Sequence, residues 1–231
     1  MKHHRQTFLR LLGLVTTEVL TLAVALLASL LLFLVMAYTV FSARSTVLDD
    51  ALFAFADQVA SPGMTKAMLA VSFFASASYL FVAPPLVVLF FCFFRRLRWY
   101  GLQVLLVTIT TSILNQLMKR FFERPRPAFA TLQQSGLSFP SGHAMIGGAF
   151  YGILIYIVWH EVNHKVLRWV LVIGFSLLIL LIGFSRIYLK VHYATDVLAG
   201  FAMGFLWLAF ALFLMHQLKK VYQNKYGIKP N

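Results

Sequence analysis

Residues 19–41 have the sequence VLTLAVALLASLLLFLVMAYTVF, a run without one charged side chain. An α-helix needs about 20 apolar residues to cross the hydrocarbon core of a bilayer, so this run predicts a membrane span. A cleavable signal peptide has an apolar core of only about 7–15 residues, which favours an uncleaved segment here. Five further apolar runs follow, at residues 67–94, 99–118, 144–159, 169–185 and 197–215. The predicted fold class is therefore all-α, a polytopic membrane protein with six transmembrane helices.

Composition supports this class. The chain has 231 residues, of which 61% are hydrophobic and 12% are charged, whereas a soluble domain carries about 25% charged residues. The net charge of +13 comes from basic residues that flank the apolar runs, which favours contact with the lipid bilayer over nucleic acid. A lone cysteine, Cys92, excludes an intramolecular disulfide. Without an internal repeat or a low-complexity linker, residues 1–231 are predicted to form a single domain.

Two details refine the predicted helices. Residues 47–60 carry Asp49, Asp50 and Asp57 opposite apolar side chains, which predicts a short interfacial helix between the first two spans. Its simplest role is a lid or brace over the bundle. Pro84 and Pro85 lie inside the run at 67–94 and predict a kink there, because proline removes a helix donor and clashes with the preceding turn.

The distribution of Lys and Arg predicts the orientation. With a cytoplasmic N-terminus, 12 of the 20 basic residues fall on the inner side. The outer side keeps Arg44, Lys66, Lys119, Arg120, Arg124, Arg126, Arg186 and Lys190. The positive-inside rule then favours cytoplasmic termini. The expected location is an integral protein of the bacterial inner membrane.

Three polar stretches share the outer face under this topology. They are KRFFERPRP at 119–127, PSGH at 140–143 and SRIYLKVHYATD at 185–196. Their spacings are K-x6-R-P, P-S-G-H and S-R-x5-H-x3-D. Ionisable side chains at membrane depth are costly, so they indicate a functional site.

The residue types suit phosphate. Arg126 and Arg186 offer planar forks for phosphate oxygens, and Lys119 adds a point charge. Ser141 can donate its hydroxyl, and Gly142 lets the backbone approach an anion closely. The backbone N–H groups that follow are expected to open a helix, whose N-terminus attracts anions.

His192 and Asp196 are one helical turn apart, so the carboxylate can reach the imidazole. Alone, such a pair is often an ordinary hydrogen bond at a helix end, and the residue types also permit the roles of His192 and His143 to be exchanged. Arg120 and Arg124 are expected to be interfacial anchors or to steer headgroups, outside the site. Whether Asn115 serves the bundle or the site is open.

These three motifs resemble those of the type 2 phosphatidic acid phosphatase (PAP2) family, which shares its core with vanadium haloperoxidases. The match covers residues 119–196, and the size and short loops are similar to the bacterial phosphatidylglycerophosphate phosphatases of the B type. The resemblance implies that His192 is the nucleophile, Asp196 its partner and His143 the general acid and base. It implies Lys119, Arg126, Ser141, Gly142 and Arg186 as phosphate ligands, with no metal and no cofactor.

The expected function is hydrolysis of phosphate from a membrane phospholipid or isoprenoid phosphate through a phosphohistidine. Candidate substrates are phosphatidylglycerophosphate, phosphatidate, diacylglycerol pyrophosphate and undecaprenyl pyrophosphate. One alternative is a phosphotransferase that passes the phosphoryl group to another lipid. A second is a transporter of anionic lipid or solute, and a third, a haloperoxidase, is disfavoured by the six spans. The oligomeric state and the path of lipid entry stay open.

Overall fold

A computed structural model describes the backbone of residues 2–128, 130 and 134–226, and the side chains of these residues from 19 to 221. Residues 1, 129, 131–133 and 227–231 of the predicted domain lie outside this part. The α-helices are α1 (Lys2–Phe41), α2 (Val47–Gln58), α3 (Pro62–Phe73), α4 (Ala77–Phe93), α5 (Arg98–Phe122), α6 (Gly148–Glu161), α7 (Lys165–Tyr188) and α8 (Ala194–Tyr226). A 3₁₀ turn, η1 (Arg95–Leu97), precedes α5, and a π-helical turn, η2 (His143–Gly147), precedes α6. The all-α prediction is confirmed.

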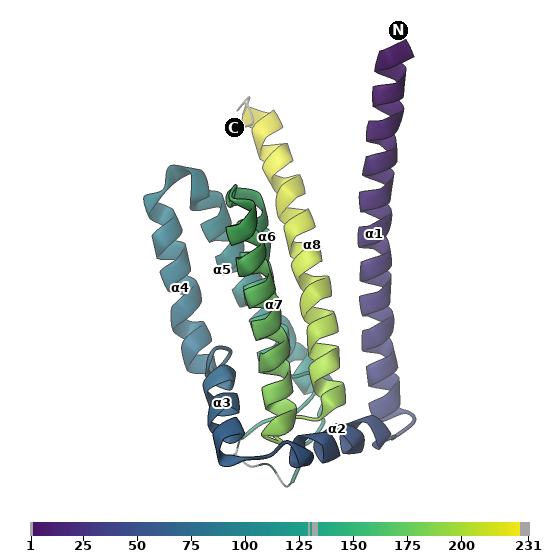
Figure 1. Cartoon of the computed structure of the whole chain (residues 1–231), viewed down its shortest axis with the longest axis vertical. Coiled ribbons are helices and arrows are strands. Elements are labelled where there is room, and N and C mark those ends of the chain that lie inside the picture. The colour runs from purple at the N-terminus through teal and green to yellow at the C-terminus, as the bar shows by residue number, and fades with distance from the viewer. Residues whose placement is uncertain (1, 129, 131–133, 227–231) are drawn as a thin grey trace.

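The long helices run roughly side by side along the molecule (Figure 1). Five of them, α1, α5, α7, α8 and η2 with α6, are long and apolar enough to span a membrane. The consecutive helices α3 and α4 meet the same criterion only together, and counted as one span bent by 47° at a short break they bring the number to six. The described ends of α1 and α8 lie at one end of the bundle, and α2 lies across the other.

The second span departs from the sequence prediction. The break lies at residues 74–76, whereas Pro84 and Pro85 both sit inside the continuous helix α4. Ser76 explains the position, because its side chain accepts the backbone N–H of Tyr79 at 3.2 Å and so caps the new helix. The sequence predicted a kink at the prolines, whereas the break that the structure shows lies ahead of them.

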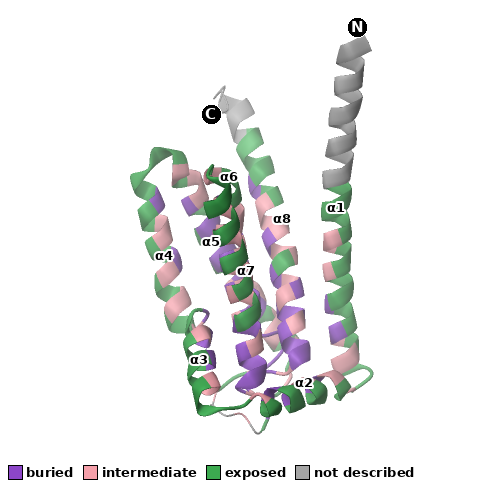
Figure 2. Cartoon of the chain, in the orientation of Figure 1, coloured by how far each residue is buried: buried purple, intermediate pink, exposed green. Residues whose placement is uncertain are grey.

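Burial is concentrated at the end of the bundle that α2 covers (Figure 2). The outward faces of the long helices carry exposed apolar side chains such as Leu27, Phe81 and Val170, as expected for surfaces that meet lipid. At the buried end, the fully covered side chains include Arg186, His192 and Asp196. Charged groups with so little exposure need partners or a function.

Glycines on α8 let that helix approach η2 closely. A Cβ atom at Gly200 would lie 2.8 Å from the carbonyl oxygen of Ser141, and one at Gly204 would lie 2.7 Å from that of Met145. Both distances are shorter than real Cβ contacts allow, so neither position tolerates a side chain without movement. Gly200 and Gly204 thus allow the second polar motif to pack directly against α8, the helix that begins within the third motif.

Candidate active site

The first motif turns back into the bundle where α5 ends. Lys119 lies in the last turn of α5, and its backbone oxygen accepts the N–H of Glu123, which adopts a left-handed φ of 48°. That residue redirects the chain, as left-handed residues commonly do after a helix. Arg126 is then fixed by hydrogen bonds from Nε to the Gly136 oxygen at 3.1 Å and from a terminal nitrogen to the Val191 oxygen at 2.9 Å.

The second motif lies between α5 and α8. Asn115 on α5 donates from Nδ2 to the Pro140 oxygen at 3.3 Å, and a Cβ at Gly142 would lie 3.1 Å from Asn115 Oδ1. The backbone N–H of Ser141 donates to the backbone oxygen of Asp196 at 3.0 Å, which joins the second motif to the third. A helical segment begins at His143, where the sequence predicted a helix to open. The structure therefore places Asn115 against the site.

The third motif occupies the turn from α7 to α8. Arg186 is in the last turn of α7, and its backbone oxygen accepts the N–H groups of Val191 and His192 at 3.1 and 3.3 Å. Lys190 has a left-handed φ of 54°, which permits this closure. His192 thus sits in a tight turn, and Asp196 follows in the first turn of α8, where the helix dipole favours a negative charge.

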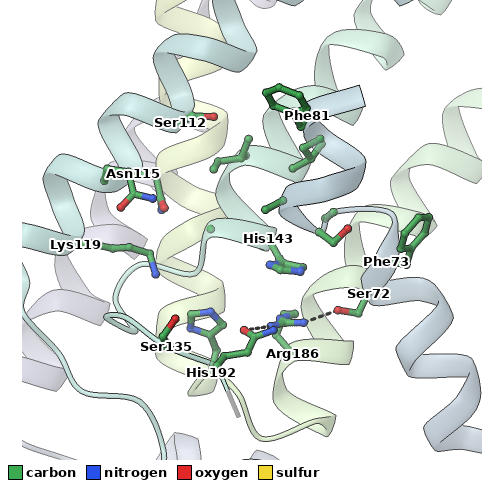
Figure 3. Close-up of a pocket in the computed structure, with 18 of the residues that line it drawn as sticks. Ser72, Phe73, Phe81, Ser112, Asn115, Lys119, Ser135, His143, Arg186 and His192 are labelled. Carbon is green, nitrogen blue, oxygen red and sulfur yellow. Dashed lines mark hydrogen bonds between the residues drawn. The ribbon is translucent and has the colours of Figure 1, made fainter. Parts of the chain in front are cut away.

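These segments enclose a cavity of about 840 Å³. Lys119, Arg126, Gly142, His143, Arg186 and His192 line it, so six of the eight predicted site residues meet there. Figure 3 shows Lys119, His143, Arg186 and His192 converging on this space, with Phe73 and Phe81 on the side away from α5. The rest of the lining is mixed. Leu69, Phe73, Leu80, Phe81 and Ile146 are apolar, while Ser72, Ser76, Ser112, Asn115, Gln116, Gln134 and Ser135 are polar and uncharged. The cavity therefore brings a cationic cluster together with several apolar side chains.

Asp196 and Ser141 lie behind this lining. Asp196 Oδ2 is 3.4 Å from Nδ1 of His192, and the other ring nitrogen, Nε2, is 3.3 Å from a terminal nitrogen of Arg126. Nδ1 therefore faces the carboxylate, while Nε2 faces the cationic part of the cavity. Burial lowers the pKa of His192 to about 4, although the hydrogen bond to Asp196 opposes that shift. The imidazole is consequently neutral at pH 7, with a lone pair available on one nitrogen.

Two buried polar atoms of the predicted phosphate ligands have no partner within the described part of the chain. They are Oγ of Ser141 and Nε of Arg186. Buried donors are normally satisfied, and each one left alone costs about 1–3 kcal/mol. Gln134 Oε1 meanwhile accepts hydrogen bonds from Arg126 at 3.1 Å and from Arg186 at 2.6 Å. The two guanidinium groups are thus close enough to share one oxygen acceptor.

The structure corrects the interpretation of Arg124 as an interfacial anchor. Its side chain is only 11% exposed and forms ion pairs with Asp196 at 2.6 Å and with Asp49 at 3.0 Å. Ser138 was also missed; its hydroxyl donates to Asp196 Oδ2 and lies 3.3 Å from Nδ1 of His192. Ser72 on α3 accepts a hydrogen bond from Arg186. No local spacing signals these contacts, because each joins residues far apart in sequence.

Bound metal has no obvious ligand set here. Among the described residues, no three or more His, Cys, Asp or Glu side chains come together in a group that could hold an ion. The positive charge around the cavity is provided by Lys119, Arg126 and Arg186.

Known proteins resemble this chain in sequence and in structure. The model of the PAP2 superfamily matches residues 100–220. Phosphatidylglycerophosphatase B of Bacillus subtilis is 34% identical over 183 residues, which cover 76% of this chain and 87% of that protein. The bacitracin transport permease protein BcrC of Bacillus licheniformis is 30% identical over 67% of this chain and 77% of its own length. The crystal structure of a transmembrane PAP2-type phosphatidylglycerolphosphate phosphatase from Bacillus subtilis superposes with a TM-score of 0.74 and 30% identity, covering 84% of this chain and 96% of that one.

Proposed function

The chain belongs to the PAP2 superfamily and is a membrane lipid phosphatase, and from this premise we propose that it hydrolyses phosphatidylglycerophosphate through a phosphohistidine at His192. The observation that carries the proposal is the divided cavity. Lys119, Arg126 and Arg186 line one part of it, and apolar side chains such as Leu80 and Phe81 line another, with uncharged polar side chains among them. A lipid with a terminal phosphate has the same division of charge. The similarity to phosphatidylglycerophosphatase B supports this choice among lipid phosphates.

In the first step, Nε2 of His192 attacks phosphorus and the bond from phosphorus to the glycerol oxygen breaks. The neutral imidazole has the lone pair that this attack requires. Arg126, Arg186 and Lys119 offset the charge that spreads over the equatorial oxygens, and Ser141 and Gly142 complete the phosphate site. His143 lines the same cavity, and in its protonated imidazolium form it gives a proton to the departing oxygen and becomes neutral.

The second step returns the enzyme to its starting state. His143, now unprotonated, takes a proton from a water molecule whose oxygen attacks phosphorus. The bond from phosphorus to Nε2 breaks, inorganic phosphate leaves, and His192 regains its lone pair. Asp196 faces Nδ1 throughout, so it stabilises the positively charged ring of the phosphohistidine.

We place the active site at the outer face of a bacterial inner membrane, with both termini in the cytoplasm. The charge distribution supports this orientation, because basic residues outside the motifs gather at the end of the bundle that holds the termini. The partners of the protein are then the bilayer and the lipid substrate that diffuses within it.

Phosphate release in detergent micelles tests the proposal. The wild type, with a chelator present and no added metal, is expected to release phosphate from phosphatidylglycerophosphate faster than from undecaprenyl pyrophosphate. His192→Ala removes the nucleophile, so its rate is expected to fall roughly 10³-fold or more. To check for the phosphohistidine, the wild type is quenched during turnover of substrate with a radiolabelled phosphate. A label on the enzyme that is labile in acid and stable in base is the expected result.

Each contrary result has a distinct meaning. Release by His192→Ala at the wild-type rate would remove His192 as the nucleophile. A faster rate with undecaprenyl pyrophosphate would overturn the choice of substrate but not the mechanism. Labelled enzyme without phosphate release, relieved by adding a second lipid, would identify a phosphotransferase.

A further inference from the structure

Asp49 is a buried carboxylate outside the three motifs and outside residues 100–220 that match the family model. It belongs to the interfacial helix α2 and is only 1% exposed. The next residue, Asp50, is exposed on the same helix. A carboxylate that gives up contact with water needs strong compensation. Its partners show what that compensation is.

The first partner is the N-terminus of α8. Asp49 Oδ1 accepts the backbone N–H of Thr195 at 2.9 Å, and Oδ2 accepts the Thr195 hydroxyl at 3.0 Å. The first N–H groups of a helix have no acceptor inside it, so they need one from elsewhere. Here α2 provides it from a distant part of the sequence. Asp49 therefore fixes the position of the helical turn that carries Asp196.

The second partner is Arg124. One terminal nitrogen of its guanidinium donates to Asp49 Oδ2 at 3.0 Å, and the other donates to Asp196 Oδ1 at 2.6 Å. Its guanidinium also lies 3.9 Å from the centre of the Tyr193 ring, which fixes the plane of the fork. The sequence of charges is thus Asp49, Arg124, Asp196 and then His192. The three charged groups alternate in sign, and the neutral imidazole of His192 ends the series.

This alternation has a consequence for His192. Arg124 occupies Oδ1 of Asp196, which leaves Oδ2 directed toward Nδ1 of the imidazole. Without Asp49, the guanidinium charge would be balanced by Asp196 alone. Less of the Asp196 charge would then be available to the ring when it becomes positive.

We propose that Asp49 is a positioning residue for the catalytic histidine, acting through Arg124 and Asp196. This inference rests on the proposed role of His192. It gives α2 a part in the reaction as well as in covering the bundle. Asp49 touches neither the cavity nor the predicted phosphate ligands, so its effect is expected on the chemical step and not on phosphate binding.

Asp49→Asn tests the inference, because the substitution removes the charge and keeps the shape. We expect kcat with phosphatidylglycerophosphate to fall about 10-fold or more. The KM and the inhibition constant of inorganic phosphate are expected to stay within about twofold, since Lys119, Arg126 and Arg186 are untouched. Asp50→Asn is the matched control and is expected to keep the wild-type kcat.

A second pair of variants separates positioning from simple stabilisation. Arg124→Gln removes the link between the two carboxylates, so the double variant Asp49→Asn with Arg124→Gln is expected to be no slower than Arg124→Gln alone. If the fold-loss of kcat in the double variant equals the product of the two single losses, the inference is overturned. A wild-type kcat in Asp49→Asn would overturn it as well. A joint rise in KM and in the phosphate inhibition constant would also overturn it, because that result indicates a disturbed fold.

If Asp49→Asn does not fold, Arg124→Gln with the same three readouts decides the question, and an unchanged kcat there refutes it. His192→Ala run beside these variants reports on the proposed function separately.

Discussion

Ser138 contacts both His192 and Asp196. Its hydroxyl donates to Asp196 Oδ2 and lies 3.3 Å from Nδ1 of His192, while the two catalytic groups themselves are 3.4 Å apart. A hydroxyl is both donor and acceptor, so Ser138 can accept from Nδ1 and donate to the carboxylate at once. It is fully buried, so water does not replace it readily. In the proposed mechanism, Ser138 is thus a third hydrogen-bonded partner of the His192–Asp196 pair.

We therefore expect Ser138→Ala to slow the reaction. A hydrogen bond to a buried charged group is worth about 1.5–3 kcal/mol, which corresponds to roughly 10-fold to 100-fold in kcat. Steady-state phosphate release from micelles measures this directly. Ser176→Ala on α7 is a fair control, because that hydroxyl donates to the Val172 oxygen of its own helix, away from the site. Equal rates for the two variants would show that Ser138 is dispensable.

Among the helices, hydropathy predicted the membrane crossings but not the break inside the second one. The apolar runs predicted six crossings because length and apolarity are properties of consecutive residues. The break between α3 and α4 escaped this test, because residues 74–76 interrupt the helix without interrupting the apolar run. The motifs likewise predicted the residues that line the cavity. Asp49, Arg124 and Ser138 could not be found in this way, since their contacts join α2, the loop after α5 and α8 across long stretches of sequence.

The close approach of α8 to η2 gives a prediction at this scale. Gly200→Ala would place a methyl group against the Ser141 oxygen and the Ala144 side chain. The second motif must then move relative to the third, so both the melting temperature and kcat are expected to fall, the latter about 10-fold. Gly174→Ala on α7 meets nothing within 4 Å, and alanine favours helix over glycine by up to about 1 kcal/mol. It should be neutral or stabilising in the same thermal and kinetic assays; similar losses for both variants would contradict the packing argument.

At the scale of the whole molecule, the fold separates two ends of the bundle. The motifs and α2 lie at one end, and the described ends of α1 and α8 lie at the other (Figure 1). Basic residues with no part in the motifs, among them Arg95, Arg98, Lys165 and Arg168, belong to the turns at the end opposite the site. A negative inner leaflet attracts such clusters. These charges, which take no part in the proposed chemistry, support the proposed orientation with this end in the cytoplasm.

Labelling of single cysteines tests this orientation. In a Cys92→Ser background, which removes the exposed native thiol, Ala60→Cys places a thiol in the exposed turn between α2 and α3. Asn163→Cys places one in the exposed turn between α6 and α7, at the opposite end. A membrane-impermeant maleimide added to intact spheroplasts is expected to label Ala60→Cys and to reach Asn163→Cys only after permeabilisation. Retained phosphate release by both variants ensures that the labelled protein is folded. Labelling in the reverse order would put the active site on the cytoplasmic side, and the lipid phosphate would then have to be hydrolysed in the inner leaflet.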